Sequence, residues 1–303
     1  MAESNNKLVL FAALGANLGI AVAKFVAAAL TGSSAMLTEG FHSVVDSSNQ
    51  LLLLYGERAS RRPPDEIHPL GYGRELYFWS FVVAILIFAT GAGLSIYEGV
   101  HHVLEPAPVQ DATVAYIVLA ISFLLEGASW LTALREFRRT QGELGWWQAI
   151  RRSKDPATFI VLFEDSAALF GLVIAAIGVF LAHWTGEPAW DGAASIVIGV
   201  ALAIVAFMLA RESKGLLIGE RADPRLIAAI RAAFAARPEV TAVQEIITIH
   251  IAPRRVYVSA SIDFEDDVPV GAVERLIAET EAALRQAWPQ IDSVYIKPKA
   301  RPA

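Results

Sequence analysis

Four polar residues recur at intervals of three and four positions within one apolar segment, 34–55. They are Glu39, His42, Asp46 and Asn49. Each residue of a helix turns the chain by about 100°, so these side chains fall within one narrow stripe. An imidazole and a carboxylate four residues apart can reach one ion, and such mixed ligands suit Zn²⁺ or a neighbouring first-row ion better than Mg²⁺ or Ca²⁺. The alternative is a hydrogen-bond cluster between helices.

Three further acids stand in other apolar segments: Glu126, Glu164 and Asp165. Adjacent helical residues point about 100° apart, so Glu164 and Asp165 cannot both face one ion with the same geometry. We expect one of them to contact Lys24 or to carry a proton. A structural ion pair is the alternative role for Glu164. For Glu126, which small residues follow, an interhelical hydrogen bond and a role in transport or proton coupling both remain open.

The composition indicates a membrane protein. The chain has 303 residues, of which 55% are hydrophobic and 18% charged, and a mean hydropathy of +0.46. Such a chain is too apolar for a single water-soluble globule. Six segments are close to the roughly 20 residues that a bilayer-spanning helix requires: 8–30, 34–55, 77–98, 113–134, 157–183 and 190–210.

Basic residues in the connections predict the orientation. Lys and Arg occur only in the second and fourth of the five connections between these segments, which carry Arg58, Arg61, Arg62, Arg74, Arg135, Arg138, Arg139, Arg151, Arg152 and Lys154. The positive-inside rule therefore places both termini in the cytoplasm. The N-terminal residues show neither a signal nor a transit peptide. A net charge of −6 without a basic stripe makes nucleic acid an unexpected partner. Without cysteine, any metal must be held by His and carboxylates.

The composition changes to that of a soluble domain after Arg211, so we expect a transmembrane domain at 1–211 and a cytoplasmic domain at 212–303. Apolar alternation and turn residues predict the second domain's elements in the order αββαβ, a ferredoxin-like arrangement. The predicted bounds are a helix at 224–236, strands at 240–251 and 256–264, a helix at 270–288 and a strand at 293–297. The hairpin turn is expected at Ala252 to Arg255.

Taken together, several features resemble the cation diffusion facilitator (CDF) family of divalent-metal/proton antiporters over nearly the whole chain. They are the run Ser34 to Asp46, the loop Pro64 to Arg74, the six helices and the αββαβ tail. The run Glu164 to Ala168 is similar to the branch that contains the mitochondrial zinc exchanger. The resemblance implies an α-helical membrane protein with six transmembrane helices and a ferredoxin-like tail.

The resemblance also implies a four-ligand transport site, in which His42 and Asp46 match the first pair and Asp165 the last position. Val161 stands where the family usually has a fourth ligand, His. Water or Glu164 then completes the site, and Glu39 is a further candidate ligand. Fewer nitrogen donors make Mn²⁺, Fe²⁺ or Co²⁺ plausible beside Zn²⁺, which ranks first.

Two other regions of the family pattern bear on metal binding. In the loop, Asp65 and His68 match a second metal site, but Tyr72 replaces its final His; the alternative is that both residues order the turn. In the tail, relatives carry metal-binding His where this chain has Gln244, Ser261 and Lys297, so a metal-bridged tail looks lost. We expect His250 to be exposed or hydrogen-bonded, and His101, His102 and His183 to lie at the membrane interface.

We therefore expect a homodimer in the prokaryotic cytoplasmic (inner) membrane that exports a divalent metal ion in exchange for protons. It is not an enzyme and needs no cofactor, because the metal ion is its substrate. Protons compete with the metal for His42, Asp46 and Asp165, and Glu126 is a further candidate for coupling. The alternative function is a non-transporting, metal-responsive membrane scaffold or regulator.

Overall fold

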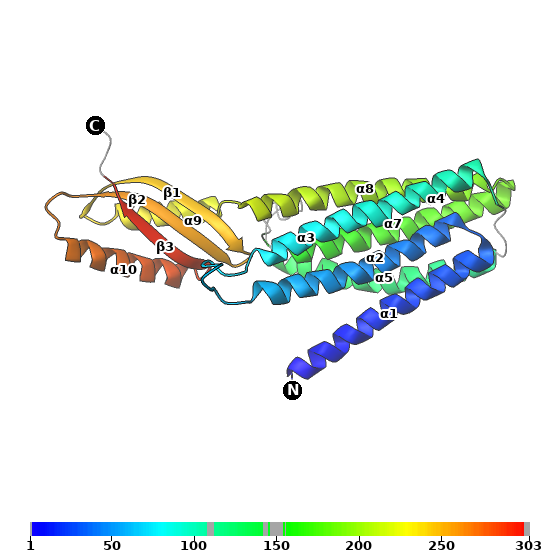
Figure 1. Ribbon diagram of the computed structural model, residues 1–303, viewed down its shortest axis with the longest axis horizontal. Coiled ribbons are helices and arrows are strands. Elements are labelled where there is room, and N and C mark those ends of the chain that lie inside the picture. The colour runs from blue at the N-terminus through cyan, green and yellow to red at the C-terminus, as the bar shows by residue number, and fades with distance from the viewer. Residues whose placement is uncertain (1, 108–111, 142–144, 146–153, 155, 300–303) are drawn as a thin grey trace.

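The computed structural model describes residues 2–107, 112–141, 145, 154 and 156–299; Arg151 and Arg152 lie outside these ranges. Figure 1 shows a bundle of long helices followed by an α/β tail. The bundle consists of α1 (Ala2–Thr31), α2 (Ser34–Ser60), a third segment made of α3 (Glu75–Leu86), η1 (Ile87–Ala92) and α4 (Gly93–Leu104), then α5 (Ala112–Gln141), α7 (Pro156–Thr185) and α8 (Ala189–Ile218). The six helical segments expected from the sequence are therefore confirmed as helices.

Hydropathy separates α2 from the more apolar helices of the bundle. Among the described residues, four helical segments are long and apolar enough to span a membrane: Glu75–Leu104, Ala112–Arg139, Phe159–Thr185 and Ala189–Ile218. The described side chains of α1 add a shorter apolar part, Asn17–Thr31. The helix α2 is not among them because its polar stripe lowers its hydropathy. A polar stripe requires neighbours that shield it from lipid, and α2 packs against α1, α3, α7 and α8.

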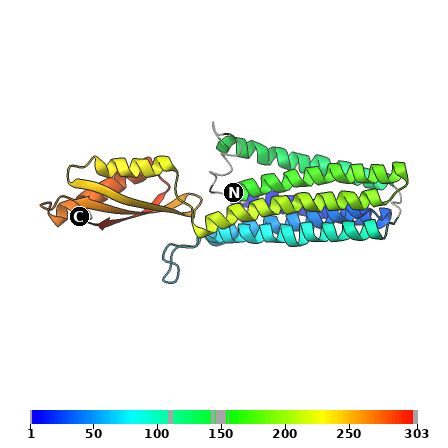
Figure 2. The same ribbon diagram turned by 90° about the horizontal axis from the view of Figure 1, so that it is seen from above.

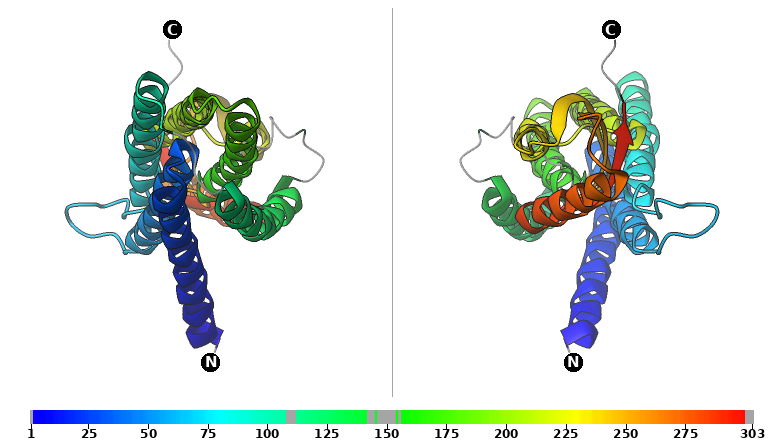
Figure 3. Two further views of the ribbon diagram at one scale, coloured as in Figure 1. Left: turned by 90° about the vertical axis from the view of Figure 1, so that its right-hand side faces the viewer. Right: turned by 90° about the vertical axis from the view of Figure 1, so that its left-hand side faces the viewer.

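Glycines allow α4 and α8 to pack very closely along their length. A Cβ atom at Gly99 would lie 2.7 Å from the backbone oxygen of Gly192, and one at Gly199 would lie 2.6 Å from Ile96. Small residues at such crossings let two helix backbones approach. The helix α5 packs mainly against α1 and α7 instead. Figure 2 shows α5 along one side of the bundle, and Figure 3, viewed along the long axis, shows α1 at its edge.

The tail has the element order predicted from the sequence. It consists of α9 (Pro224–Ala235), β1 (Val240–Ala252), β2 (Arg255–Phe264), α10 (Val270–Ala287) and β3 (Ile291–Pro298). In the sheet order β1-β2-β3, β2 pairs antiparallel with β1 and parallel with β3. Ala252 pairs with Arg255, which confirms the expected hairpin turn. The ferredoxin-like αββαβ expectation is thus confirmed.

Alternate residues of β2 form the centre of the tail core. Val256, Val258 and Ile262 are fully buried and pack with Phe234 of α9 and Leu284 of α10. This alternation is the period-two pattern of a strand with one covered face.

The last helix of the bundle extends past residue 211 toward the tail. The helix α8 continues to Ile218, with Leu216 buried on its inner face, and ends at Gly219 with φ 118°. Lys154, which follows α5 in the chain, forms an ion pair with Glu220 just after this helix.

Candidate functional site

The helix α2 directs its polar stripe into the bundle. Ser33 caps its first turn by accepting a hydrogen bond from the Met36 backbone N–H at 3.2 Å. Glu39, His42 and Asn49 are each at most 1% exposed. The interhelical stripe expected from the spacing is therefore present, and its polar side chains face neighbouring helices.

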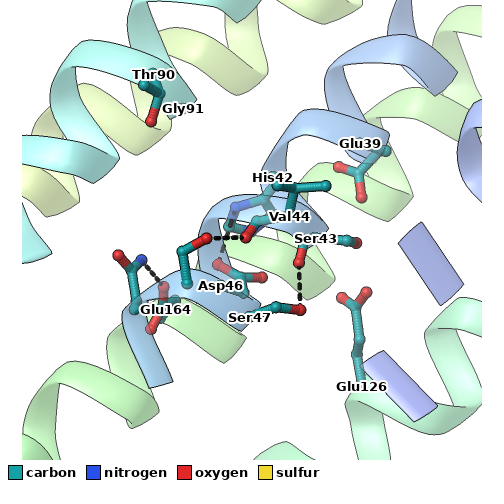
Figure 4. Close-up of polar contacts among 12 residues, drawn as sticks. Glu39, His42, Ser43, Val44, Asp46, Ser47, Thr90, Gly91, Glu126 and Glu164 are labelled. Carbon is teal, nitrogen blue, oxygen red and sulfur yellow. Dashed lines mark hydrogen bonds and ion pairs between the residues drawn. The ribbon is translucent and has the colours of Figure 1, made fainter. Parts of the chain in front are cut away.

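His42 and Asp46 form the first contact of the stripe. The His42 Nδ1 atom lies 3.3 Å from an Asp46 carboxylate oxygen, one helical turn along α2 (Figure 4). Both ring nitrogens of His42 are buried without a hydrogen-bond partner. A buried polar atom without a partner is costly. The imidazole therefore retains the capacity to bind another group.

Asp46 and Asp165 line one small cavity of about 40 Å³ inside the bundle. Asp165 reaches it from α7 and accepts a 2.9 Å hydrogen bond from the hydroxyl of Ser129 on α5. Glu126 of α5 lines it as well. The remaining lining residues come from α1, α2, α5 and α7: Asn17, Ile20, Ser43, Gln50, Leu125, Ser129 and Ala168. Three carboxylates from three helices thus meet around one cavity.

Lys24 of α1 contacts a different set of residues from the one expected. Its fully buried Nζ donates to Glu39 at 3.0 Å, to Ser43 at 2.9 Å and to Glu126 at 2.7 Å. An ammonium group has three donors, and these contacts use all of them. The expectation that Glu164 or Asp165 contacts Lys24 is therefore wrong. For Glu126, the interhelical contact that the sequence left open is confirmed.

Glu164 lies on the other side of α2 from Glu126 in Figure 4. Its carboxylate accepts a 2.5 Å hydrogen bond from the amide of Asn49, and its side chain is buried. Glu164 thus contacts α2 through the neutral amide of Asn49 and through the carboxyl group of Asp46. Among the described residues, the ion pair considered for Glu164 is not found. The Asn49 contact ties α7 to the polar stripe one turn beyond Asp46.

The candidate ligands are near one another but do not form a compact coordination shell. Within the described ranges, no three His, Cys, Asp or Glu side chains are placed to hold one metal ion. Val161 lines a second, larger cavity of about 960 Å³, between the tail-proximal end of the bundle and the tail. Gln50 lines both cavities. Val161, one turn before Asp165 on α7, is not among the residues that line the smaller cavity.

A buried carboxylate that the sequence reasoning missed lies at the opposite end of the bundle. Asp191 of α8 accepts hydrogen bonds from the Ser33 hydroxyl at 2.6 Å and from the backbone N–H groups of Ser34 at 2.5 Å and Ala35 at 3.2 Å. It thereby satisfies the free N–H groups that begin α2. The available signal was an acid at the start of the otherwise uncharged segment 190–210.

His102 approaches the same carboxylate from α4. Its Nε2 atom lies 3.8 Å from Asp191, and the residue is 6% exposed. Because α4 packs against α8, this contact turns the His102 ring toward a neighbouring helix at this end of the bundle. The interfacial depth expected for His102 stays a prediction. His101 and His183 are exposed near the same end.

In the loop between α2 and α3, Asp65 orders the turn. One carboxylate oxygen accepts from the backbone N–H of His68 at 2.6 Å, and the other accepts from the Tyr72 hydroxyl at 2.6 Å. The Tyr72 bond and then the His68 bond lower the pKa of Asp65, while Asp65 raises the pKa of Tyr72. These are the turn-ordering contacts considered as the alternative to a second metal site. His68 Nδ1 lies 3.6 Å from an Asp65 carboxylate oxygen.

His250 is buried in the tail, so the exposed position considered for it is wrong. Burial lowers the pKa of its imidazole, and the nearby Lys154 lowers it further. Its backbone N–H donates to the Glu220 carbonyl at 2.9 Å, which joins β1 to the segment after α8. The position of His250 therefore reflects the packing of the tail onto its linker.

Comparison with known proteins adds independent findings. The family model described as the cation efflux transmembrane domain matches residues 10–218. The mitochondrial proton-coupled zinc antiporter SLC30A9 of Xenopus laevis is 35% identical over 247 residues, which are 81% of this chain and 44% of that protein. The chain thus spans less than half the length of that relative.

Two further similarities cover other shares of the chain. The cation-efflux pump FieF of Klebsiella pneumoniae is 24% identical over 299 residues, which are 97% of this chain and 94% of that protein. Among solved structures, a nickel form of a MamM CTD is 16% identical, with 26% of this chain and 100% of that chain covered and a TM-score of 0.24.

Proposed function

Because the chain belongs to the cation efflux family, we propose that it is a secondary transporter that exports a divalent metal cation from the cytoplasm in exchange for protons. The observation that carries the proposal is the cavity inside the bundle, where Asp46, Glu126 and Asp165 meet from three helices. Carboxylates within a membrane domain are costly unless they serve an ion or proton pathway. Zinc ranks first as the substrate, since the relative from Xenopus laevis is a zinc antiporter by name.

The proposed transport site consists of His42, Asp46 and Asp165. His42 and Asp46 are already in contact, and Asp165 lines the cavity with Asp46. The two unpartnered ring nitrogens of His42 support a ligand role. Binding requires these groups to converge further, with Glu164 beside them as a further donor. Glu39, the other candidate from the sequence, is bonded to Lys24 and does not line this cavity. Zn²⁺ takes such mixed nitrogen and oxygen ligands, while Mn²⁺, Fe²⁺ and Co²⁺ accept oxygen-richer sets.

Proton coupling follows from the chemistry of the ligands. An imidazole and two carboxylates bind a cation only when they are deprotonated. Protons arriving from the acidic side of the membrane therefore compete with the metal and promote its release. A transport cycle then needs the two orientations of the site to differ in affinity for metal and proton.

The route to the site is proposed to open on the cytoplasmic side. Gln50 lines both the inner cavity and the 960 Å³ cavity, which also contacts Arg254 and Arg255 of the tail. The basic residues of the connections favour a cytoplasmic position for this end of the bundle and for both termini. A prokaryotic inner membrane is the proposed location, with residues 1–211 forming the transport domain and 212–303 its cytoplasmic partner.

Two parts of the proposal concern assembly and the loop. We expect a homodimer because the resemblance to the family implies one, and two-fold dimers are the commonest closed homo-oligomers among soluble proteins. A second metal at Asp65 and His68 would have to displace the bonds that Asp65 makes to its own turn. The loop is therefore proposed as a weaker site than the cavity.

Transport by the purified full chain in vesicles tests the proposal. Vesicles that contain a metal-sensitive dye are given external Zn²⁺ or Mn²⁺. The interior of the vesicles is either more acidic than the outside or at the same pH. We expect metal influx that requires the protein and is accelerated by the gradient. Metal binding without flux under any gradient would instead support the metal-responsive scaffold.

A further inference from the structure

Lys24 is a buried cation bound directly to the wall of the proposed transport site. Two of its three partners, Ser43 and Glu126, line the inner cavity with Asp46 and Asp165. The third partner, Glu39, does not line that cavity. The ammonium group therefore lies behind the cavity wall and holds one of the cavity's three carboxylates.

Glu126 faces two ways at once. Its Oε1 atom accepts the 2.7 Å hydrogen bond from Lys24, the shortest of the three bonds of that ammonium group. Its Oε2 atom is buried without a hydrogen-bond partner. Since a carboxylate has two oxygens and several lone pairs, the free oxygen of Glu126 can still coordinate a second cation.

We propose that Glu126 is a ligand of the transported cation, and that Lys24 is a tethered cation that competes with the metal ion for this carboxylate. The inference rests on the proposed function and deepens it by assigning the missing donor. Val161 cannot supply one, because it is apolar and lines the other cavity. The separation of the candidate ligands has the same explanation, since Glu126 is held toward α1 by Lys24 while His42 is in contact with Asp46.

A ligand shared in this way makes the site weak until Glu126 leaves Lys24. A metal ion entering the cavity attracts Glu126 and repels the ammonium group, so binding exchanges one cation partner for another. When the metal leaves, Lys24 recovers Glu126 and offsets the cost of the bare carboxylate. The ammonium group thus limits how tightly the site holds its substrate.

The donor set also bears on selectivity. Glu126 in place of the imidazole usual in the family gives one nitrogen and three carboxylate ligands. Oxygen donors suit Mn²⁺ and other harder divalent ions, whereas nitrogen donors favour Zn²⁺. Loss of Glu126 should therefore weaken Mn²⁺ binding more than Zn²⁺ binding.

Glu39 provides a matched comparison because it shares Lys24 with Glu126 but does not line the cavity. The double variant Lys24→Gln with Glu39→Gln removes one positive and one negative charge, so the buried net charge is preserved. Glu126 is left without its tethered cation. The single variant Glu126→Gln removes the proposed ligand and leaves the Lys24–Glu39 ion pair in place.

The experiment is calorimetric titration of the purified full-length protein with Zn²⁺ and Mn²⁺ at fixed pH. For the double variant we expect Mn²⁺ affinity to rise about tenfold, since a nearby positive charge is gone. For Glu126→Gln we expect at least a roughly tenfold loss, which is greater for Mn²⁺ than for Zn²⁺. Ser48→Ala is the control on α2, because Ser48 is exposed and its hydroxyl donates to the Val44 carbonyl of its own helix.

Thermal unfolding of each variant, monitored in parallel, separates binding from folding. If Lys24 and Glu126 form only a structural ion pair, both variants will unfold at lower temperature, and the folded double variant will bind metal no more tightly than the wild type. That result, or wild-type affinity in Glu126→Gln, would overturn the inference while leaving the transport proposal intact. If the wild type binds neither ion, the proposed function is wrong, and the inference that rests on it is wrong as well.

Discussion

The helical bundle and the tail bury different kinds of side chain. In the bundle, Lys24, Glu39 and Asp191 are completely buried, and each contacts polar groups on other helices. In the tail, the most deeply buried side chains are apolar, such as Phe234 and Val256. Among the tail residues that the structure describes, His250 is the one titratable side chain that is buried.

The difference teaches where the chemistry of the molecule is located. A charged group within a bilayer has no water to solvate it, so it persists only with a partner or with an ion pathway to serve. A small domain in water gains its stability from apolar burial and leaves its charges at the surface. This contrast supports the proposal that the bundle binds the ion and that the tail has a packing role.

The strongest test of this comparison is the loss of transport. We expect His42→Ala and Asp165→Asn each to abolish metal flux in vesicles, because each removes a ligand of the proposed site. The matched controls are His101→Ala, an exposed histidine of α4, and Asp266→Asn, an exposed acid of the tail. Normal flux in either site variant would show that the ligands lie elsewhere.

The next test concerns a buried carboxylate with a structural role. Asp191→Ala should lower the free energy of unfolding by about 1–3 kcal/mol or more, because it leaves buried N–H donors of α2 without an acceptor. In the tail, Asp292 pairs with the partly exposed Arg255 at 2.6 Å, so Asp292→Ala should cost less than about 1 kcal/mol. Unfolding in detergent measures both. Equal decreases in the free energy of unfolding would contradict the contrast drawn between the bundle and the tail.

A smaller effect is expected from the pH dependence of the tail. Burial lowers the pKa of His250, so the unfolded chain binds more protons than the folded one as the pH falls below the ordinary pKa of about 6.5. Folding stability should therefore be highest above that pH and decrease on acidification. His250→Gln should flatten this slope, as measured by denaturant unfolding between neutral and mildly acidic pH. An unchanged slope would mean that His250 titrates alike in both states.

The smallest effect is the absence of a response to metal in the tail. Residues 212–303 contain a single His and no Cys, and that His is buried. We expect His250→Gln to bind Zn²⁺ with the stoichiometry and affinity of the wild-type chain in calorimetric titration. A lost binding event would assign a metal site to the tail and contradict the division of roles.

Patterns that repeat along the chain could be predicted from the sequence. The polar stripe from Glu39 to Asn49 follows from the helical period, and the core strand around Val258 follows from alternation. Both depend on neighbours a few residues away. The element order of the tail and the number of long helices were therefore within reach of local reasoning.

Contacts between helices were not within that reach. The sequence shows Lys24 as a cation in an apolar segment. Helix packing pairs it with Glu39 and Glu126, whereas the sequence had suggested Glu164 or Asp165. Asp191 likewise finds its partners at Ser33 and Ser34, far away along the chain.

The sequence by itself determined which residues carry charge into the membrane and which face of its own helix each one occupies. The tertiary structure alone decided which charges meet, which carboxylates line one cavity and that Val161 lines another. The physical reason is that helical period depends on the backbone of one segment, whereas the partner of a buried charge depends on how helices rotate and slide against one another. Those rotations are set by all the packed side chains together.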